Sequence, residues 1–349
     1  MQITPVAAPE HEQVVRIADP ESGLLGFIAI HSTRRGPAAG GVRMRPYAQE
    51  ADALNDALRL SRGMTYKNAA AGLDLGGGKA VIMADPATQK TPDLLAAFGA
   101  AVETLAGRYW TAEDMGMTPA DMARIGTRTA CVAGLADGDF ASGDPSPITA
   151  RGIFNAIRTA ARHRFGSDDL RGRTVSVQGL GHVGHYLCGY LHDAGAKLIV
   201  TDIDAGQVAR VAEEFGATAV APDAIYGVEA DIFAPCAIGA ILNAETIPQL
   251  KVGVVAGGAN NQLATPEDAT RLHDLGILYA PDYVANGGGI INVATEILKI
   301  SGREAWVAGR LAALDDTMDR ILTRARTLSV SPAEVADATV DEILQAKAA

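Results

Sequence analysis

Thr174-Val175-Ser176-Val177-Gln178-Gly179-Leu180-Gly181-His182-Val183-Gly184 is the stretch of sequence that predicts the fold. A β-rich run leads directly into G-x-G-x-x-G, and a helical pattern follows as far as Ala194-Gly195. At a strand-to-helix junction the first glycine makes the tight turn, the second admits a pyrophosphate, and the third lets helix and strand pack closely. The phosphates then meet the helix N-terminus. We therefore expect a dinucleotide site that includes Gly179, Gly181, His182, Val183 and Gly184.

An acid follows the next predicted strand. The apolar run 197–201 ends at Asp202, which lies 18 residues after Gly184. This is close to the spacing of the acid that binds the ribose 2′-hydroxyl, and a carboxylate there repels a 2′-phosphate. Asp204 adds a second acid, and Arg210 is the only nearby cation. The sequence therefore favours NAD over NADP.

Further short strands are predicted at 231–234, 252–256 and 277–280, alternating with amphipathic stretches. This alternation is typical of a doubly wound parallel sheet, in which ligands lie beyond the carboxyl ends of the strands. The clusters expected there are Pro235-Cys236-Ala237, Gly257-Gly258-Ala259-Asn260-Asn261 and Pro281-Asp282-Tyr283. The amides of Asn260 and Asn261 could orient a nicotinamide or a substrate amine. The alternative is a loop in which asparagines bond their own backbone.

Two lysines frame a glycine-rich stretch in the N-terminal half. Met64-Thr65-Tyr66-Lys67 and Gly76-Gly77-Gly78-Lys79 are separated by alanines, glycines and few polar residues. Three successive glycines predict a loop that another molecule approaches closely. A lysine near a second cation and sheltered from water loses its proton more easily, so one lysine could act as a base while the other holds a carboxylate. The alternative is a glycine-rich surface turn between two solvated lysines.

The elements around these lysines follow from periodicity and breakers. We expect a hairpin over 14–19 and 24–32, a helix over 51–63 that stops at Gly63, a buried strand over 80–83, a helix over 91–107 and a strand over 109–114. That last strand ends in Glu113 and Asp114. Asp114 belongs either to the site or to the cap of a helix beginning near Thr118.

Composition limits the class of protein. The 349 residues are 48% hydrophobic and 20% charged, which suits two globular domains, and the net charge of −11 argues against a nucleic-acid or anionic membrane partner. Cys131, Cys188 and Cys236 lie far apart, so we expect no disulfide framework and a cytoplasmic protein. No targeting segment or membrane span is predicted. Neither a zinc spacing nor a Ser-His-acid arrangement is present, and no metal is expected.

Taken together, the motifs resemble the Glu/Leu/Phe/Val dehydrogenase family, and its leucine-specific branch in particular, from Gly36 to about Ala294. The motifs that carry the resemblance are Gly40-Gly41-Val42-Arg43-Met44, Met64-Thr65-Tyr66-Lys67, Gly76-Gly77-Gly78-Lys79, Thr111-Ala112-Glu113-Asp114, Ser146-Pro147-Ile148-Thr149-Ala150, Ile232-Phe233-Ala234-Pro235-Cys236-Ala237 and Tyr279-Ala280-Pro281-Asp282-Tyr283. The resemblance implies reversible, NAD-dependent oxidative deamination of branched-chain L-amino acids (leucine, also valine and isoleucine) to 2-oxo acids and ammonia. An aromatic L-amino acid dehydrogenase is the alternative within the family. A non-catalytic NAD-binding regulator is the alternative outside it.

The resemblance also implies residue roles. Lys79 would activate water against the imine carbon, Asp114 would exchange protons with the amine, and Lys67 would hold the substrate carboxylate. The other residues implied on the substrate side are Gly40, Gly41, Met64, Ala112, Asn261 and Val293. Those implied on the cofactor side, besides the loop and Asp202, are Thr149, Cys236, Ala237, Asn260 and Asn286. Glutamate enzymes of the family carry a lysine where this chain has Ala39, so glutamate is disfavoured.

We expect an α/β protein of two domains with a cleft between them. Residues 1–134 would form an N-terminal α/β domain for substrate binding and oligomerisation, and residues 135–325 a doubly wound Rossmann-type NAD domain. Residues 326–349 would form a helical segment that packs back on the first domain. The resemblance implies a homo-oligomer, a dimer or higher, whose partners are small molecules: an amino acid, a 2-oxo acid and ammonia.

Overall fold

The computed structural model describes residues 1–346, which divide into two compact units. The first unit contains Met1–Pro145, Ile290–Ala308 and the described residues from Ile343 onward, and the second contains Ser146–Gly289 and Gly309–Glu342. Two units, each with its own sheet, confirm the predicted α/β fold class.

The limits of the units differ from those expected at 134 and 325. Residues 135–145 group with the first unit because the buried Glu296 carboxylate accepts hydrogen bonds from the backbone N–H groups of Gly134 and Ser142. Residues 326–342 group with the second unit, and the expected C-terminal residues 347–349 lie outside the described part of the chain.

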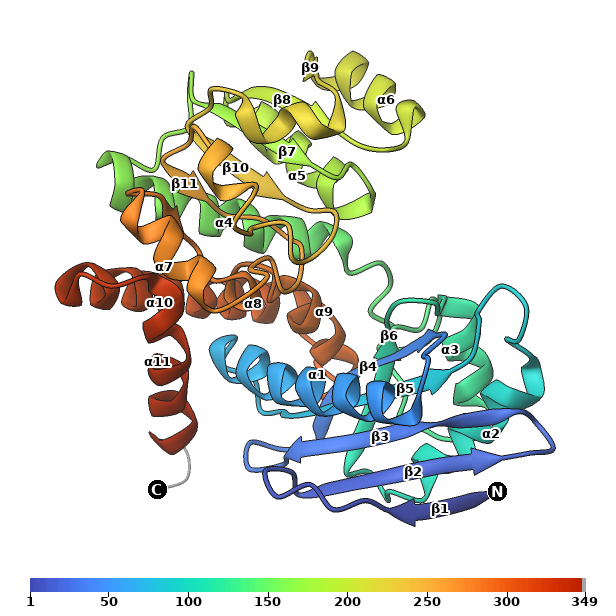
Figure 1. The fold of residues 1–349 in the computed structure, drawn as a ribbon. Helices are drawn as coiled ribbons and strands as arrows, with labels where there is room; N and C mark the ends of the chain where they lie inside the picture. Colours follow the sequence, from blue (N-terminus) through green and yellow to red (C-terminus); the bar gives the residue numbers. More distant parts are fainter. Residues whose placement is uncertain (347–349) are drawn as a thin grey trace. The chain divides into compact units, whose positions relative to one another are not determined.

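The first unit is built on a mixed sheet in the order β1-β2-β3-β5-β4-β6 (Figure 1). Its strands are β1 (Gln2–Pro5), β2 (Gln13–Asp19), β3 (Leu24–Ser32), β4 (Ala38–Arg45), β5 (Gly76–Met83) and β6 (Tyr109–Glu113). β2 and β3 form the predicted antiparallel hairpin, with Gly23 at φ +78° in its turn. β4 pairs in parallel with β5 on one side and β6 on the other.

Helices cover both faces of this sheet. α1 (Glu50–Ala70) packs Ala53 and Ala57 against the face that carries Phe27 and Val81. α2 (Pro92–Glu103) and α3 (Pro119–Gly126) pack on the opposite face of the sheet. The strand residues on that face alternate with those that point toward α1. The two faces alternate along each strand, as the pleat of a sheet requires.

α1 is longer than the sequence predicted, because it continues through Gly63 to Ala70. A glycine inside a helix costs only about 1 kcal/mol, and the second half of α1 buries Thr65, Asn68 and Ala69. Gly72, at φ +66°, follows the helix end. The expected stop at Gly63 is therefore wrong, and Met64 and Lys67 lie on the helix itself. The predicted helix over 91–107 instead ends at Glu103.

The glycines at 76, 77 and 78 form a buried strand, not the expected loop. A Cβ at Gly77 would lie 2.1 Å from the Thr65 backbone nitrogen, and one at Gly78 would lie 2.6 Å from the Tyr109 ring. The partners that approach these glycines are therefore α1 and β6 of the protein itself. The expected strand over 80–83 begins four residues earlier, at Gly76.

The second unit contains a parallel sheet in the order β12-β11-β10-β7-β8-β9. Its strands are β7 (Thr174–Gln178), β8 (Lys197–Thr201), β9 (Thr218–Ala219), β10 (Ile232–Pro235), β11 (Val254–Val255) and β12 (Leu278–Tyr279). The chain runs outward from β7 to β9 and returns to the other side of β7 at β10, which is the doubly wound topology predicted.

Helices flank this sheet, and all four residues of β10 are buried. The helical elements that begin in the second unit are α4 (Ser146–Phe165), α5 (His182–Asp193), α6 (Ala205–Phe215), η1 (Pro222–Gly227), η2 (Ile247–Gln249), α7 (Glu267–Asp274), α8 (Asp282–Ala285), α9 (Gly288–Ile297) and α11 (Pro332–Ala346). α10 (Arg303–Leu328) begins in the first unit, and α9, α10 and α11 each continue from one unit into the other.

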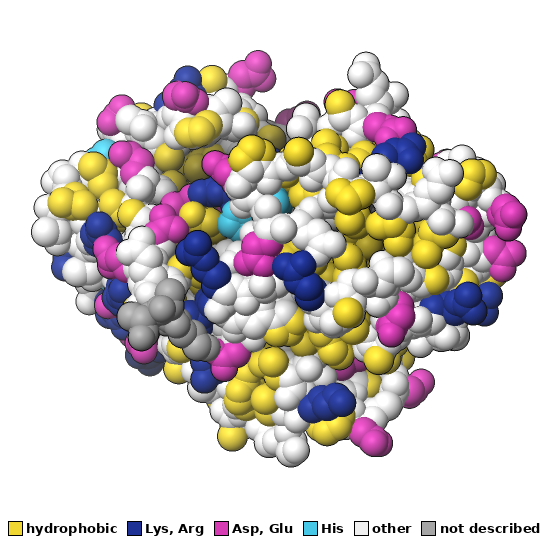
Figure 2. Space-filling model, turned by 90° about the horizontal axis from the view of Figure 1, so that it is seen from below, with side chains coloured by type: hydrophobic (Ala, Val, Ile, Leu, Met, Phe, Trp, Pro, Cys, Tyr) yellow, Lys and Arg dark blue, Asp and Glu magenta, His cyan; other side chains and the backbone are white. Residues whose placement is uncertain are grey.

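Charge is dispersed over the face seen in Figure 2. Lys and Arg side chains stand there among acidic and apolar ones and do not merge into one block. Within residues 1–346, none of the helices has the length and hydropathy needed to cross a bilayer.

Candidate functional site

Lys79 lies in the middle of the first-unit sheet, on β5. The parallel register pairs Val42 with Ala80, so Lys79 stands beside Gly41 on the face covered by α1. Its residue is only 6% exposed. A buried ammonium requires a partner, because burying an unpaired charge is costly. The alternative of a solvated lysine on a surface turn is therefore wrong.

Asp114 is that partner. Its Oδ2 accepts a hydrogen bond from Lys79 Nζ, and its Oδ1 accepts one from the Met115 backbone N–H at 2.7 Å. Asp114 follows β6 and passes over Gly41, where a Cβ would lie 2.8 Å from the Asp114 Cβ. The carboxylate thus reaches Lys79 because residue 41 has no side chain.

Asp114 does not cap the helix near Thr118. That helix, α3, has its own capping box, in which Thr118 and Asp121 exchange hydrogen bonds. Burial by itself would raise the pKa of Asp114, but the Lys79 ammonium and the Arg43 guanidinium outweigh it and lower the pKa to about 2. The pair is thus a fixed carboxylate beside a buried amine, which suits proton exchange with a bound substrate.

α1 and β4 bring further predicted residues to this place. A Cβ on Gly40 would lie 3.0 Å from Met64 Cγ, so Met64 on α1 lies directly against that glycine. Lys67 is partly exposed and follows Met64 by three residues, so both lie on neighbouring turns of one helix face. Tyr109, fully buried, donates a hydrogen bond to the Gly40 carbonyl at 2.8 Å and holds this backbone in place.

The remaining predicted substrate residues are divided between the units. Ala112 on β6 is 7% exposed, and Val293 on α9, 9% exposed, also belongs to the first unit. Asn261 belongs to the second unit, where it adopts φ +53° and its carbonyl accepts from the Ala240 N–H. The roles of these residues toward substrate stay predictions.

The glycine-rich loop of the second unit has the geometry that its sequence predicted. Gly179 adopts φ +94°, and a Cβ there would lie 2.6 Å from the Ala237 backbone nitrogen. A Cβ on Gly184 would lie 1.9 Å from the Gly179 carbonyl oxygen. A Cβ on Gly181 would meet nothing within 4 Å, so this glycine faces open space at the start of α5. Gly181 is the N-cap of α5, and having no side chain it makes no capping hydrogen bond to the first turn.

The acid after β8 is bonded to this loop. Asp202 Oδ2 accepts a hydrogen bond from the Leu180 N–H at 2.6 Å, and Oδ1 accepts one from the Asp204 N–H. Asp204 itself caps α6 through the Gly206 N–H. Asp202 is therefore the acid placed at the loop, and Asp204 has a structural role.

The loops at the carboxyl ends of β10 and β11 also gather here. A Cβ on Gly258 would meet Val183 Cγ1 at 3.4 Å and Cys236 Sγ at 3.5 Å. Asn286 Nδ2 donates to the Gly258 carbonyl at 3.1 Å and to Asn260 Oδ1 at 2.7 Å. Thr149, at the start of α4, lies against Gly288, since a Cβ on Gly288 would lie 2.9 Å from the Thr149 Cα.

These features fit a bound dinucleotide. The open space at Gly181 and the uncapped start of α5 can receive phosphates. Asn286 Oδ1 is buried and has no hydrogen-bond partner among the described residues, and a carboxamide N–H can supply one. The individual cofactor contacts of His182, Val183, Cys236, Ala237 and the other predicted residues stay predictions.

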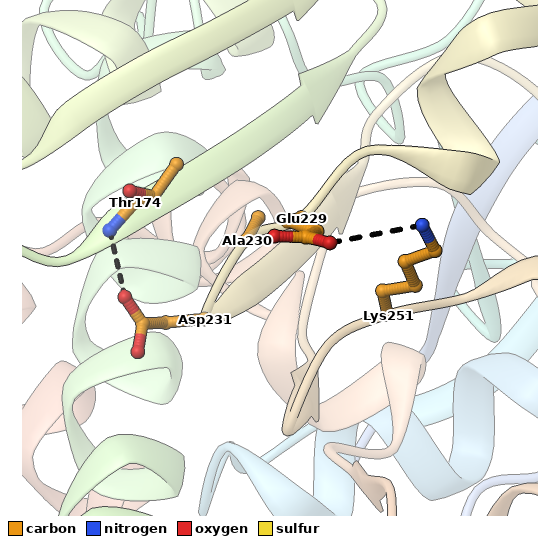
Figure 3. A pocket seen from close by; sticks show the side chains of 5 residues that line it. All are labelled: Thr174, Glu229, Ala230, Asp231 and Lys251. Carbon is orange, nitrogen blue, oxygen red and sulfur yellow. Dashed lines mark hydrogen bonds and ion pairs between the residues drawn. The ribbon is translucent and has the colours of Figure 1, made fainter.

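A cavity of about 420 Å³ lies at the opposite edge of this sheet (Figure 3). It is lined at the amino-terminal ends of β7 and β10, where Asp231 accepts from the Thr174 N–H and Lys251 pairs with Glu229 at 3.8 Å. Ligands of doubly wound sheets bind beyond the carboxyl ends, so this cavity is separate from the dinucleotide loop. In the described chain, no group of three His, Cys, Asp or Glu side chains is placed to hold a metal ion.

The structure adds residues that the sequence did not single out. Arg43 lies 3.7 Å from Asp114, Asp56 holds Arg43, and Tyr109 fixes Gly40. Asn68 on α1 donates to the Gly76 carbonyl at 2.5 Å and fastens the helix to β5. One signal was available for Arg43, because it follows Gly41 by two residues in a strand and so shares its face.

Comparison with known proteins agrees with this geometry. Residues 11–130 match the family model described as Glu/Leu/Phe/Val dehydrogenase, dimerisation domain, and residues 142–210 and 200–346 match that described as Glutamate/Leucine/Phenylalanine/Valine dehydrogenase. The leucine dehydrogenase of Geobacillus stearothermophilus is 50% identical over 96% of this chain and 91% of its own. The phenylalanine dehydrogenase of Caldalkalibacillus thermarum is 46% identical over 97% and 92%.

A solved structure extends the likeness to three dimensions. The crystal structure of L-tryptophan dehydrogenase from Nostoc punctiforme superimposes with a TM-score of 0.84 at 42% identity, covering 97% of each chain. The resemblance carried by the sequence motifs is confirmed. The chain belongs to the Glu/Leu/Phe/Val dehydrogenase family of NAD-dependent amino acid dehydrogenases.

Proposed function

We propose that the protein catalyses the reversible oxidative deamination of branched-chain L-amino acids, L-leucine foremost, to 2-oxo acids and ammonia. The observation that carries this proposal is the ion pair of the buried Lys79 with the partly buried Asp114, at the centre of the first-unit sheet. The identity of 50% with a leucine dehydrogenase over nearly the whole chain supports it.

The residues present can supply each proton step. Lys67 would bind the substrate carboxylate as a point charge, and Asp114 would accept a proton from the substrate ammonium. NAD, when bound, supplies the oxidising equivalent by accepting a hydride from the α-carbon. Lys79 would take a proton from the water that attacks the resulting imine carbon. As the tetrahedral amino alcohol collapses, Asp114 would return its proton to the amino nitrogen while the hydroxyl proton passes to solvent, which releases ammonia and the 2-oxo acid.

The side chains near the pair support an apolar substrate. Ala39 is fully buried between Gly77 and Trp110 of the neighbouring strands, so no cation is offered at this position to an acidic side chain. A glutamate carboxylate buried there would lack a partner. Leucine, valine and isoleucine differ by a methylene or less, which is worth about 1 to 3 kcal/mol, so we expect overlapping activity on all three.

The first test is a substrate panel. Purified protein is assayed for NADH formation with L-leucine, L-valine, L-isoleucine, L-phenylalanine and L-glutamate, each with NAD and with NADP. We expect the highest kcat/KM with L-leucine and NAD, because Asp202, which is bonded to the glycine-rich loop, would bind the ribose 2′-hydroxyl and repel a 2′-phosphate. No turnover with any amino acid would favour a non-catalytic NAD-binding regulator.

The second test removes the amine. Lys79→Ala is expected to lower kcat by roughly 10² to 10⁴, the usual worth of a general base, while NADH binding measured by fluorescence is retained. Lys90→Ala is the matched control, since Lys90 is a partly buried lysine that, like Lys79, pairs with an aspartate, here Asp121 at 2.7 Å. Turnover of Lys79→Ala at the level of Lys90→Ala would remove Lys79 from the mechanism.

An aromatic amino acid dehydrogenase is the second candidate. The small side chain of Ala39 leaves room for a larger substrate, and the phenylalanine and tryptophan enzymes quoted above are 46% and 42% identical. The ratio of kcat/KM for L-leucine to that for L-phenylalanine decides between the two.

We also propose a cytoplasmic homo-oligomer, a dimer or higher. The match of residues 11–130 to a dimerisation domain supports association, and the free thiols of Cys131, Cys188 and Cys236 suit a reducing compartment. Light scattering after size-exclusion chromatography tests the association, since an oligomer would have a mass that is a multiple of the 36.1 kDa of one chain.

A further inference from the structure

Arg43 is a partly buried cation next to the proposed catalytic pair. It lies on β4, two residues after Gly41 and on the same face as Lys79 of β5. Its Nε is 3.7 Å from Asp114 Oδ2, the oxygen that Lys79 also contacts. That Nε is buried and makes no hydrogen bond to any described residue. Arg43 is therefore close to Asp114 without being bonded to it.

Asp56 holds Arg43 at this distance. From α1 its Oδ2 accepts a hydrogen bond from Arg43 Nη1 at 3.0 Å and another from the Tyr47 hydroxyl at 2.8 Å. Its Oδ1 accepts from Arg59 Nη2 at 3.0 Å. The side chains of Arg43 and Asp56 are each 13% exposed, so water screens this ion pair only weakly.

The four charges form an alternating row, and each comes from a different element. Asp56 on α1, Arg43 on β4, Asp114 after β6 and Lys79 on β5 are each in contact with, or within 4 Å of, the next. We propose that Arg43 is a positioning residue of the reaction: anchored by Asp56, it shares the Asp114 carboxylate with Lys79 and sets the acid limit of the pH range in which this pair works. The inference rests on the proposed function, and it adds residues to which that function assigned no part.

The direction of the effect follows from charge. A neighbouring cation makes the proton of the Asp114 carboxyl easier to remove, and Arg43 is such a cation. Asp56 opposes Arg43 and also keeps it from closing fully on Asp114. Besides the members of the row, the titratable and charged groups that interact with it are Arg59 from α1, Tyr109 from β6 and Tyr47 between β4 and α1.

The test compares charge changes of opposite sign. In Arg43→Gln the acid limb of the profile of kcat/KM against pH for L-leucine oxidation is expected to move to higher pH by at least about half a unit. At a fixed pH on that limb, kcat/KM would then be roughly threefold lower than in the wild type. In Asp56→Asn the same limb is expected to move to lower pH. Arg43→Lys, which keeps the charge, is expected to restore most of the wild-type profile. Loosened packing would give both neutral variants the same change and could not produce opposite signs.

Arg16→Gln is the matched control. Arg16 on β2 lies level with Arg43 across the sheet, since the strand pairings run from Arg16 through Phe27 and Val81 to Arg43. Like Arg43, it pairs with an acid of α1, in this case Glu50 at 2.6 Å. Three strand spacings of about 4.8 Å place it about 14 Å from Arg43, beyond the screening length in physiological salt. Its acid limb is expected to coincide with that of the wild type.

Each outcome decides the proposal. An Arg43→Gln limb that coincides with the wild-type limb, or an equal upward shift in Arg43→Gln and Asp56→Asn, would overturn it. Should Arg43→Gln not fold, Asp56→Asn decides, since an unmoved limb would contradict the role of the row. A ¹³C titration of the Asp114 carboxyl carbon in wild type and Arg43→Gln needs no substrate. This titration tests the effect of Arg43 on Asp114 even if the protein shows no amino acid dehydrogenase activity. Such an absence of activity would contradict the proposed function alone.

Discussion

Gly41 is the residue whose missing side chain allows the catalytic pair to form. A Cβ at this position would lie 2.7 Å from the Glu113 carbonyl oxygen and 2.8 Å from the Asp114 Cβ, and both contacts are too short to persist. We expect Gly41→Ala to push Asp114 away from Lys79 and to lower kcat/KM by roughly 10²-fold, since a displacement of about 1 Å can cost that much. Steady-state kinetics with L-leucine measure it, and unchanged kinetics would contradict this role of Gly41.

The sequence could predict the members of this site better than their contacts. The sequence singled out Lys79 and Asp114, which the structure brings into contact, and Lys67, whose role stays a prediction, because each stands in a motif of recognisable composition. The ion pairs of Arg43 were not, because Asp56 and Asp114 are brought to it by a helix crossing and by the strand order β5-β4-β6. A local window along the chain contains no information on which carboxylate will face a given cation.

Among the elements, α1 and β5 show why local signals misled. Glycine disfavours both helices and strands, yet α1 continues as a helix through Gly63, and the three glycines before Lys79 belong to the strand β5. Each buries an extended surface against the other: a Cβ on Gly77 would lie 2.2 Å from Thr65 Oγ1, so helix and strand are in direct contact. Tertiary packing outweighs a propensity penalty of about 1 kcal/mol per glycine. The strands β2, β3, β6 and β7 were predicted because they carry no such conflict.

The exposed position of Gly63 leads to a prediction at the scale of the helix. A Cβ there would meet nothing within 4 Å, and its φ is helical, so alanine fits without strain. We expect Gly63→Ala to stabilise the first unit by about 0.5 to 1 kcal/mol through the lower entropy of the unfolded chain. The midpoint of thermal unfolding followed by fluorescence measures it. A lower midpoint would mean that α1 needs flexibility at this turn.

At the scale of the whole molecule, both tryptophans report on one unit. The chain has two, Trp110 and Trp306, and both belong to the first unit. Ellipticity at far-ultraviolet wavelengths reports on the helices of both units. The unfolding of the first unit can therefore be followed separately within the intact protein, which matters because a molecule of two units need not unfold in one step.

Acid should weaken the two units unequally. Burial, with repulsion from His11 and Arg62, lowers the pKa of His31 in the first unit to about 4. Its folded-state pKa lies below the unfolded value of 6.5, so its contribution is complete above about pH 6.5 and is lost as the pH falls toward 4. In the second unit, burial and the neighbouring Asp316 raise the pKa of Asp315 to about 6, so protonation there favours the folded state as the pH falls below 6.

We therefore expect the fluorescence midpoint to fall more than the ellipticity midpoint between pH 7 and pH 5. His31→Asn, which can keep a hydrogen bond to Thr65 Oγ1, should remove much of the fluorescence change. The effect is about 1 to 2 kcal/mol over the full titration, after a discount for the partial exposure of the ring. Asp315→Asn is the control in the other unit and should leave the fluorescence change as it is. If His31→Asn lost as much stability between pH 7 and pH 5 as the wild type, this histidine would not be the cause of the acid sensitivity of the first unit.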